Sequence, residues 1–175
     1  MRPVVAILVT LIGCAPPLEV KPQPNRPLRI VSRSPEGPST RFFTQASCAP
    51  AGQTFSLGVV DDDTNDTISS LWFVDQAPTS VPFTTTPRPP GASTTRTVNA
   101  PAAPSFMTTL NDLTLGTHLL TVYVADTPFN EVVNGNVTVG PRMVGTRAAD
   151  GGVGAVQEPG YIDEFTWVLN VERCP

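Results

Sequence analysis

The sequence is poor in the residues on which most enzymes and metal sites depend. Its 175 residues include one histidine, His118, and three cysteines. A single histidine excludes zinc sites built from several histidines and leaves His-based catalysis at most one location. No G-x-S-x-G, H-E-x-x-H, C-x-x-C, Walker A or G-x-G-x-x-G pattern occurs in a context that would support its chemistry. We therefore expect no enzymatic activity and no bound cofactor.

Charge and long apolar runs are scarce as well. Charged residues make up 15% of the chain, where soluble proteins usually have about a quarter. The net charge of −4 and the isoelectric point near 4.8 argue against a nucleic-acid partner. The longest N-terminal apolar run, Val4 to Ile12, is far shorter than the roughly 20 residues of a membrane-spanning helix.

The N-terminus instead has the pattern of a secretion signal, with Arg2 followed by that short apolar run. The run ends at Leu11-Ile12-Gly13-Cys14, which resembles the lipobox of bacterial lipoproteins. The resemblance implies cleavage after residue 13, acylation of the Cys14 thiol by chains such as palmitate, and often acylation of the new amino group. An ordinary cleaved signal with an incidental cysteine is the alternative.

Lipid on Cys14 would place the protein in the cell envelope, with the membrane as its first partner. Each buried CH₂ contributes about 0.8 kcal/mol, so two or three chains anchor firmly where one is marginal. In well-studied Gram-negative lipoproteins, aspartate after the cysteine favours retention in the inner membrane. Ala15 occupies that position here, which favours the outer membrane.

The remaining two cysteines are Cys48 and Cys174. An exported protein meets an oxidising compartment, so an even pair predicts a disulfide. This bridge would join the two ends of the folded domain, and the loop-entropy relation gives about 4–5 kcal/mol for loops of this size. Two unpaired buried thiols are the alternative.

The segment 14–40 is predicted to be a proline-rich tether. Its prolines fix φ and disfavour helix, and only Leu28-Arg29-Ile30-Val31 has the character of a short strand. Five basic and two acidic residues lie between Glu19 and Arg41, a balance that suits an anionic membrane surface. A solvated linker with scattered charges explains the same pattern equally well.

From residue 41 to residue 175 the pattern predicts an all-β, antiparallel sandwich. Apolar and polar residues alternate over 55–59, 118–125 and 165–171, and 70–74 is a short apolar run. Period-two alternation with aromatic and β-branched enrichment indicates strands, and no window of 12 or more residues has helical periodicity. The expected core residues are Phe55, Leu57, Val59, Trp72, Tyr123, Trp167 and Leu169.

The sequences 55–63 with 71–75, and 113–126, resemble strands of extracellular immunoglobulin-like domains of the PKD and cadherin-like kind. The resemblance covers separate blocks and implies an immunoglobulin-like sandwich whose last strand is 165–171. Two long Pro-, Thr- and Gly-rich insertions, 76–105 and 127–160, depart from the compact form. Short strands are expected near 94–98 and 136–139, with a flexible stretch at 148–154.

An acidic cluster follows the first predicted strand of the domain. Asp61, Asp63 and Asp66 are candidate calcium ligands, because oxygen-rich turns suit that ion. The spacing does not continue as an EF-hand, since Asp66 replaces the required glycine and Trp72 the required glutamate. A solvated polar turn is the simpler interpretation, and we expect no further metal site.

Two other candidates for chemistry are weak. His118 has no neighbouring nucleophile in the pattern, so we expect an ordinary strand residue. Asp163 and Glu164 are adjacent in a strand and therefore point to opposite faces. The function that the sequence favours is a lipid-anchored envelope protein whose sandwich binds an envelope protein or a polysaccharide, through the two insertions or exposed sheet edges. A calcium-dependent adhesion or carbohydrate-binding module is the alternative.

Overall fold

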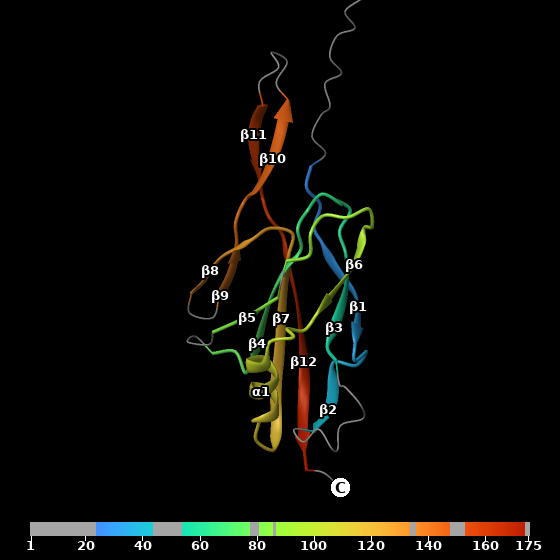
Figure 1. Ribbon diagram of the computed structural model, residues 1–175, viewed down its shortest axis with the longest axis vertical. Coiled ribbons are helices and arrows are strands. Elements are labelled where there is room, and N and C mark those ends of the chain that lie inside the picture. The colour runs from blue at the N-terminus through green and yellow to red at the C-terminus, as the bar shows by residue number, and fades with distance from the viewer. Residues whose placement is uncertain are drawn as a thin grey trace, which may run out of the picture.

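The computed structural model describes residues 24–43, 54–77, 81–85, 87–133, 136–147 and 153–173. These residues form two packed β-sheets, a short helix and two additional hairpins, in an elongated molecule (Figure 1). Most strand pairs are antiparallel, as the period-two alternation predicted. The all-β sandwich is therefore confirmed.

The first sheet has three strands in the order β1-β3-β6. They are β1 (Arg29–Ser34), β3 (Ser56–Val60) and β6 (Thr95–Asn99), and both pairings are antiparallel. In β3 the odd positions Leu57 and Val59 are completely buried, while the even positions are half-buried. The alternation seen in the sequence thus separates the core face of this sheet from its outer face.

The second sheet has five strands in the order β2-β12-β7-β4-β5. They are β2 (Ser39–Phe43), β12 (Ile162–Glu172), β7 (Gly116–Ala125), β4 (Ser69–Val74) and β5 (Phe83–Thr84). The pairing of β2 with β12 is parallel and the others are antiparallel. The long central pair β7 and β12 forms the axis of the molecule (Figure 1).

Aromatic rings dominate the core between the sheets. Trp72 of β4 and Trp167 of β12 stack with ring centroids 6.0 Å apart and an interplanar angle of 10°. The edge of Phe55 packs against Trp167 at 5.2 Å from the other sheet, a geometry that aromatic pairs favour. The expected core is confirmed except for Tyr123, which is half-buried on the outer face, because its even-numbered neighbours Val122 and Val124 face inward.

The helix α1 (Pro104–Asn111) covers one end of the core. Proline at its first position costs nothing there, because the first N–H of a helix has no partner within the helix. Phe106 and Leu110, four residues apart, are both buried, and Phe106 contacts Trp72 edge-on. Two buried positions are too few to produce a visible helical period, so the sequence did not reveal α1.

In the part of the chain that is described, no helix is long and apolar enough to cross a membrane.

The insertion at 127–160 contains two hairpins where one short strand was expected. One pairs β8 (Phe129–Val133) with β9 (Asn136–Val139), and the other pairs β10 (Arg142–Arg147) with β11 (Val153–Glu158). Residues 153–154 of the expected flexible stretch are thus strand, and 148–152 lie outside the described residues. The β10–β11 hairpin projects beyond the sandwich at the end opposite the C-terminal end of β12 (Figure 1).

The folded domain begins before residue 41, where the tether was expected to end. Leu28 is buried in the core, β1 pairs with β3, and β2 begins at Ser39. Gly58 permits this pairing, since a Cβ there would lie 2.2 Å from Ser32 Oγ. The expected boundary was too late because prolines at 35 and 38 fall between the two strands, where they interrupt neither ladder.

Candidate interaction surfaces

The cysteines on which the sequence predictions rest lie outside the described residues. Cys14 precedes residue 24, Cys48 falls within 44–53, and Cys174 follows residue 173. Their neighbours are nevertheless placed. Phe43, at the end of β2, is in register with Glu172 near the end of β12. The two strands that lead toward Cys48 and Cys174 therefore finish at the same end of the second sheet.

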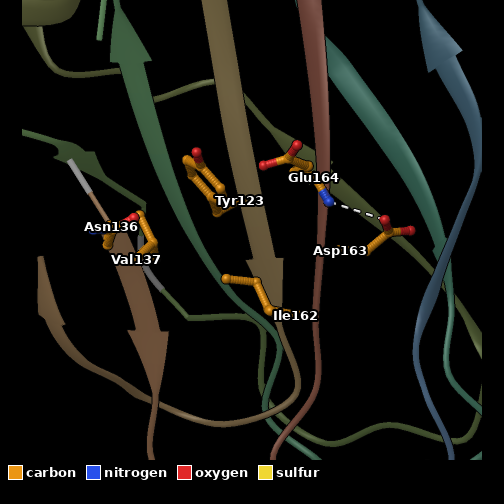
Figure 2. A pocket seen from close by; sticks show the side chains of 6 residues that line it. All are labelled: Tyr123, Asn136, Val137, Ile162, Asp163 and Glu164. Carbon is orange, nitrogen blue, oxygen red and sulfur yellow. Dashed lines mark hydrogen bonds between the residues drawn. The ribbon is translucent and has the colours of Figure 1, made fainter. Parts of the chain in front are cut away.

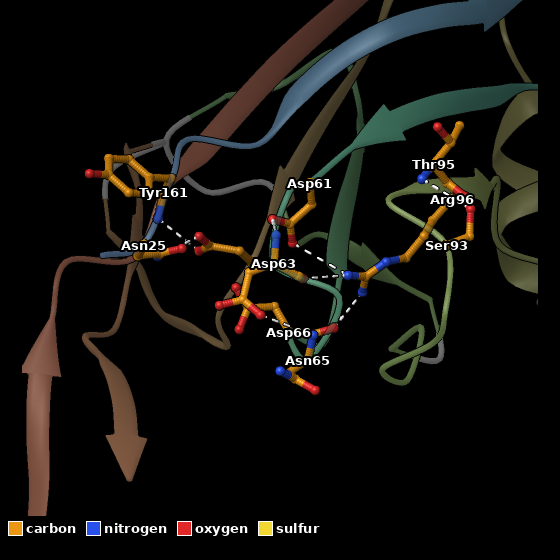
Figure 3. A network of polar contacts seen from close by, with 10 residues as sticks. Asn25, Asp61, Asp63, Asn65, Asp66, Ser93, Thr95, Arg96 and Tyr161 are labelled. Carbon is orange, nitrogen blue, oxygen red and sulfur yellow. Dashed lines mark hydrogen bonds and ion pairs between the residues drawn. The ribbon is translucent and has the colours of Figure 1, made fainter. Parts of the chain in front are cut away.

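The acidic turn after β3 is organised around one arginine (Figure 3). Arg96 of β6 is buried, and its Nη2 donates to the Asp63 carbonyl at 2.8 Å. Its Nη1 donates to the Asp66 carbonyl, and Nη2 lies 3.5 Å from Asp61 Oδ2. The guanidinium thus holds both sides of the turn. It supplies the positive charge that the sequence interpretation assigned to calcium.

The two carboxylate oxygens of Asp61 differ in their hydrogen bonding, although the residue is buried. Oδ1 accepts the backbone N–H of Asp63 at 3.0 Å, which closes an Asx turn. Oδ2 has no hydrogen-bond partner and is fully buried, although it faces the guanidinium. Desolvation raises the pKa of Asp61, and the Asp63 N–H and the Arg96 charge oppose that rise only in part.

A second buried group lies beside the turn. Asn25 donates from Nδ2 to Asp126 at 2.8 Å and to the Pro159 carbonyl at 3.0 Å. The other oxygen of Asp126 accepts the Tyr161 N–H at 2.8 Å. The Asn25 backbone N–H donates to Glu158 at the base of the β10–β11 hairpin. These bonds join the N-terminal entry of the domain to the base of that hairpin.

The acidic residues do not converge as metal ligands. Among the residues whose placement is described, no group of three or more His, Cys, Asp or Glu side chains could hold a metal ion. Asp61, Asp66 and Asp126 are all buried, but Arg96 lies within the turn and Asn25 binds Asp126. Asp63 is half-buried, and its carboxylate accepts the Asn65 N–H in a second Asx turn.

A cavity of about 370 Å³ lies between β9 and the outer face of the second sheet (Figure 2). Tyr123 on its wall donates to Gln76 at 3.1 Å, and burial is the main cause of its raised pKa. Asp163 also lines it, but its carboxylate accepts the Ile30 N–H of β1. Asp163 and Glu164 therefore do not work as a pair. The full lining is Tyr123, Asn136, Val137, Ile162, Asp163 and Glu164.

His118 has a specific partner that the sequence did not indicate. Its Nδ1 lies 2.6 Å from Asp75 Oδ2, and its Nε2 lies 2.9 Å from the Thr114 carbonyl. Asp75 has a positive φ of 47°, and its other oxygen accepts the Leu119 N–H at 2.8 Å. The hydrogen bond to Asp75 raises the pKa of His118. The two residues are 43 positions apart, and only the pairing of β4 with β7 brings them together.

A groove of about 400 Å³ opens on the side of the sandwich where β5 and β6 face each other. One wall is the edge of β6 with the residues that lead to α1, and the other includes Thr84, Thr85 and Arg88. The lining is Ile68, Thr84, Thr85, Arg88, Thr97, Val98, Asn99, Ala100, Pro101, Ala102 and Ala103. All of the lining except Ile68 lies in the segment 76–105, which was expected to be an insertion. The groove was not expected, because it forms only where edge strands of two different sheets approach each other.

No protein-family model, curated protein or solved structure matches this chain.

Proposed function

We propose that this protein is a lipid-anchored component of the bacterial cell envelope whose β-sandwich is a binding or structural module. The lipobox-like sequence that ends at Cys14 supports the anchor. The sandwich supports the module, since most of the aromatic side chains that the structure describes pack in or against one core. Its mechanism is local concentration: a tethered domain needs only modest contacts to stay bound to a neighbour.

The observation that carries this proposal is the lipobox-like sequence at Cys14, and the direction in which the chain enters the domain then orients the module. Asn25 is bonded to the base of the β10–β11 hairpin, at the end opposite the C-terminal end of β12 (Figure 1). Nine residues lie between Cys14 and Pro24, and an extended proline-rich segment spans roughly 3.1 Å per residue. An anchor at Cys14 would therefore keep the hairpin end near the membrane and present the end with α1 outward.

The strand order also supports an immunoglobulin-like sandwich. The N-terminal segment contributes β1 to one sheet and β2 to the other, where β2 runs parallel to the last strand. The strands β3 and β6 face the strands β4, β7 and β12 across one core. Within this proposal Cys48 and Cys174 form a disulfide, because the chain segments that lead to them leave neighbouring parallel strands.

The anchor is tested on the native protein. Mass spectrometry of the mature N-terminal peptide is expected to find acyl chains on Cys14. The variant Cys14→Ser is expected to appear in the soluble fraction after cell lysis, while Cys48→Ser stays with the membranes. Wild-type protein that is soluble and unmodified at Cys14 would contradict the proposal.

One observation favours the calcium-dependent alternative. Three carboxylates, those of Asp61, Asp66 and Asp126, are buried in the described region, and Arg96 is the buried cation there. An excess of buried negative charge attracts cations. If calcium binds, millimolar calcium raises the melting temperature of the wild type and Asp61→Asn or Asp63→Asn removes the effect. An unchanged melting temperature dismisses this alternative.

A further inference from the structure

The outer edge of β6 carries backbone groups that point into the groove described above. Asp61 N–H donates to the Thr94 carbonyl and Ala100 N–H to the Phe55 carbonyl, each at 2.9 Å. In an antiparallel ladder these bonds alternate along the strand, so residues 94, 96, 98 and 100 bond to β3. The N–H and C=O groups of Thr97 and Asn99 therefore point away from β3, toward the groove.

These edge groups have no partner within the described part of the chain. The neighbouring edge position, Thr95, is closed by Ser93, whose Oγ bonds both its N–H and its C=O. No corresponding bond exists at Thr97 or Asn99 among the residues that are placed. Two donors and two acceptors at two-residue spacing are the pattern that an additional strand recognises.

Two other edges of the sandwich are closed or short. The Ile30 N–H of β1 donates to the carboxylate of Asp163 at 2.8 Å, which places a negative charge along that edge. The opposite edge strand, β5, has only two residues, Phe83 and Thr84. Inward-pointing charges and short strands are the usual protections of a sheet edge. The open part of β6 contains neither.

The groove also has one charge, which defines the partner's chemistry. Arg88 is held by two backbone bonds to Ile68, of 2.7 and 3.0 Å. Its side chain is exposed and forms no ion pair with any described residue. Thr84, Thr85 and Asn99 add uncharged polar groups to the lining. An exposed guanidinium beside unpaired amides is complementary to a carboxylate on an extended chain.

We propose that an extended segment of a partner polypeptide binds in this groove as an additional strand on β6, with an acidic side chain opposite Arg88. This inference rests on the proposed function and deepens it, because it specifies how the module recognises its partner. Main-chain bonds to Thr97 and Asn99 would supply affinity, and Arg88 would select for acidic residues. The membrane anchor plays no part in this recognition.

The test uses the full-length protein in detergent micelles and a panel of blocked hexapeptides. Each peptide alternates threonine and valine and has one glutamate, which is moved through the six positions. Matched panels replace the glutamate with lysine or methylate alternate backbone nitrogens. Amide hydrogen exchange at Thr97 and Asn99 is followed by NMR.

Two pairs of variants separate the contributions. Thr97→Pro removes only an outward N–H, which an edge position tolerates, and Thr97→Ala keeps it. Arg88→Glu reverses the charge, and Arg88→Lys preserves it. If Thr97→Pro does not fold, the N-methylated peptides test the same bonds on the wild-type protein.

We expect at least one glutamate peptide to slow exchange at Thr97 and Asn99 by about tenfold or more. Backbone methylation of the peptide should abolish both effects, and Thr97→Pro, which has no amide proton at position 97, should abolish the protection of Asn99. Arg88→Glu should reverse the preference between glutamate and lysine.

Equal effects of methylated and unmethylated peptides would overturn the inference, as would the absence of protection by every peptide. Binding of polygalacturonate that Arg88→Glu removes and Thr97→Pro does not, without peptide binding, would overturn the inference and assign the groove to a polysaccharide. Membrane release of Cys14→Ser is scored separately and stands whichever result is obtained.

Discussion

Arg96 Nη2 lies 3.5 Å from Asp61 Oδ2, and both side chains are almost wholly removed from water. The guanidinium binds the Asp63 and Asp66 carbonyls as well, so it adds to the hydrogen bonds that the turn makes within itself. The carboxylate has a smaller role, since one of its oxygens lacks a hydrogen bond. The two members of this ion pair should therefore differ in their importance for stability.

Arg96→Met should lower the free energy of unfolding by about 3–5 kcal/mol, because it leaves a buried carboxylate without its counter-charge and removes the guanidinium bonds to two carbonyls of the turn. Asp61→Asn should cost less than about 1.5 kcal/mol, because asparagine keeps the acceptor for the Asp63 N–H and burial already disfavours the charged form. Urea denaturation measures both values. Arg88→Met, which removes an exposed arginine, is the control and should change stability by no more than about 0.5 kcal/mol. Equal losses for Arg96→Met and Asp61→Asn would contradict this account.

The His118–Asp75 pair predicts a dependence of stability on pH. The hydrogen bond to Asp75 raises the pKa of His118 in the folded protein. Its stabilising contribution is therefore complete below the unfolded pKa of about 6.5, and it is lost as the pH rises through the higher folded pKa. Between pH 5.5 and pH 8.5 the free energy of unfolding should fall more for the wild type than for Asp75→Asn. The asparagine can retain the bond to the Leu119 N–H. Parallel pH profiles would show that the pair contributes nothing.

The position of the domain boundary can be tested by truncation. A chain that begins at residue 24 retains Leu28 and both N-terminal strands, whereas one that begins at residue 41 loses Leu28, all of β1 and two of the five residues of β2. The shorter chain should lose about 3 kcal/mol or more from the lost apolar burial and strand pairing. Tryptophan fluorescence during urea denaturation reports this loss, because the Trp167 indole donates to the Pro35 carbonyl. Equal urea midpoints for the two chains would show that residues 24–40 belong to the tether and not to the folded domain.

The proposed Cys48–Cys174 bridge predicts a redox-dependent melting temperature. Peptide mapping without reductant should recover the two cysteines in one linked peptide. Reduction should destabilise the protein by up to about 4–5 kcal/mol, the loop-entropy value for a loop of more than 100 residues. The double variant Cys48→Ala/Cys174→Ala should melt where the reduced wild type does and should not respond to reductant. Free thiols at both positions in protein from the envelope would refute the bridge.

Much of the architecture could be predicted from the chain, and the reason is visible at particular residues. Leu57 and Val59 alternate with half-buried neighbours, and this period-two pattern is local. Tyr123 was assigned to the wrong face because β7 is apolar on both sides, so the alternation there does not distinguish inside from outside. The helix α1 has two buried positions, too few for a periodic signal.

The surfaces were much less predictable. Asp61, Asp63 and Asp66 were recognisable as a cluster, but their counter-ion is 30 or more positions away, on β6. Asp75 lies 43 residues from His118. The groove has walls from both sheets. Partners separated this far in sequence leave no pattern in a short window.

The sequence by itself determined the β-sandwich class, the main strands and most of the core, because alternation and aromatic content act over a few residues. It also contains the lipobox-like segment on which the proposed anchor depends. Only the tertiary structure decided that residues 24–40 belong to the fold, that Arg96 occupies the acidic turn and that the edge of β6 is open. Those features depend on which strands become neighbours, and strand neighbours are chosen by the packing of the whole domain.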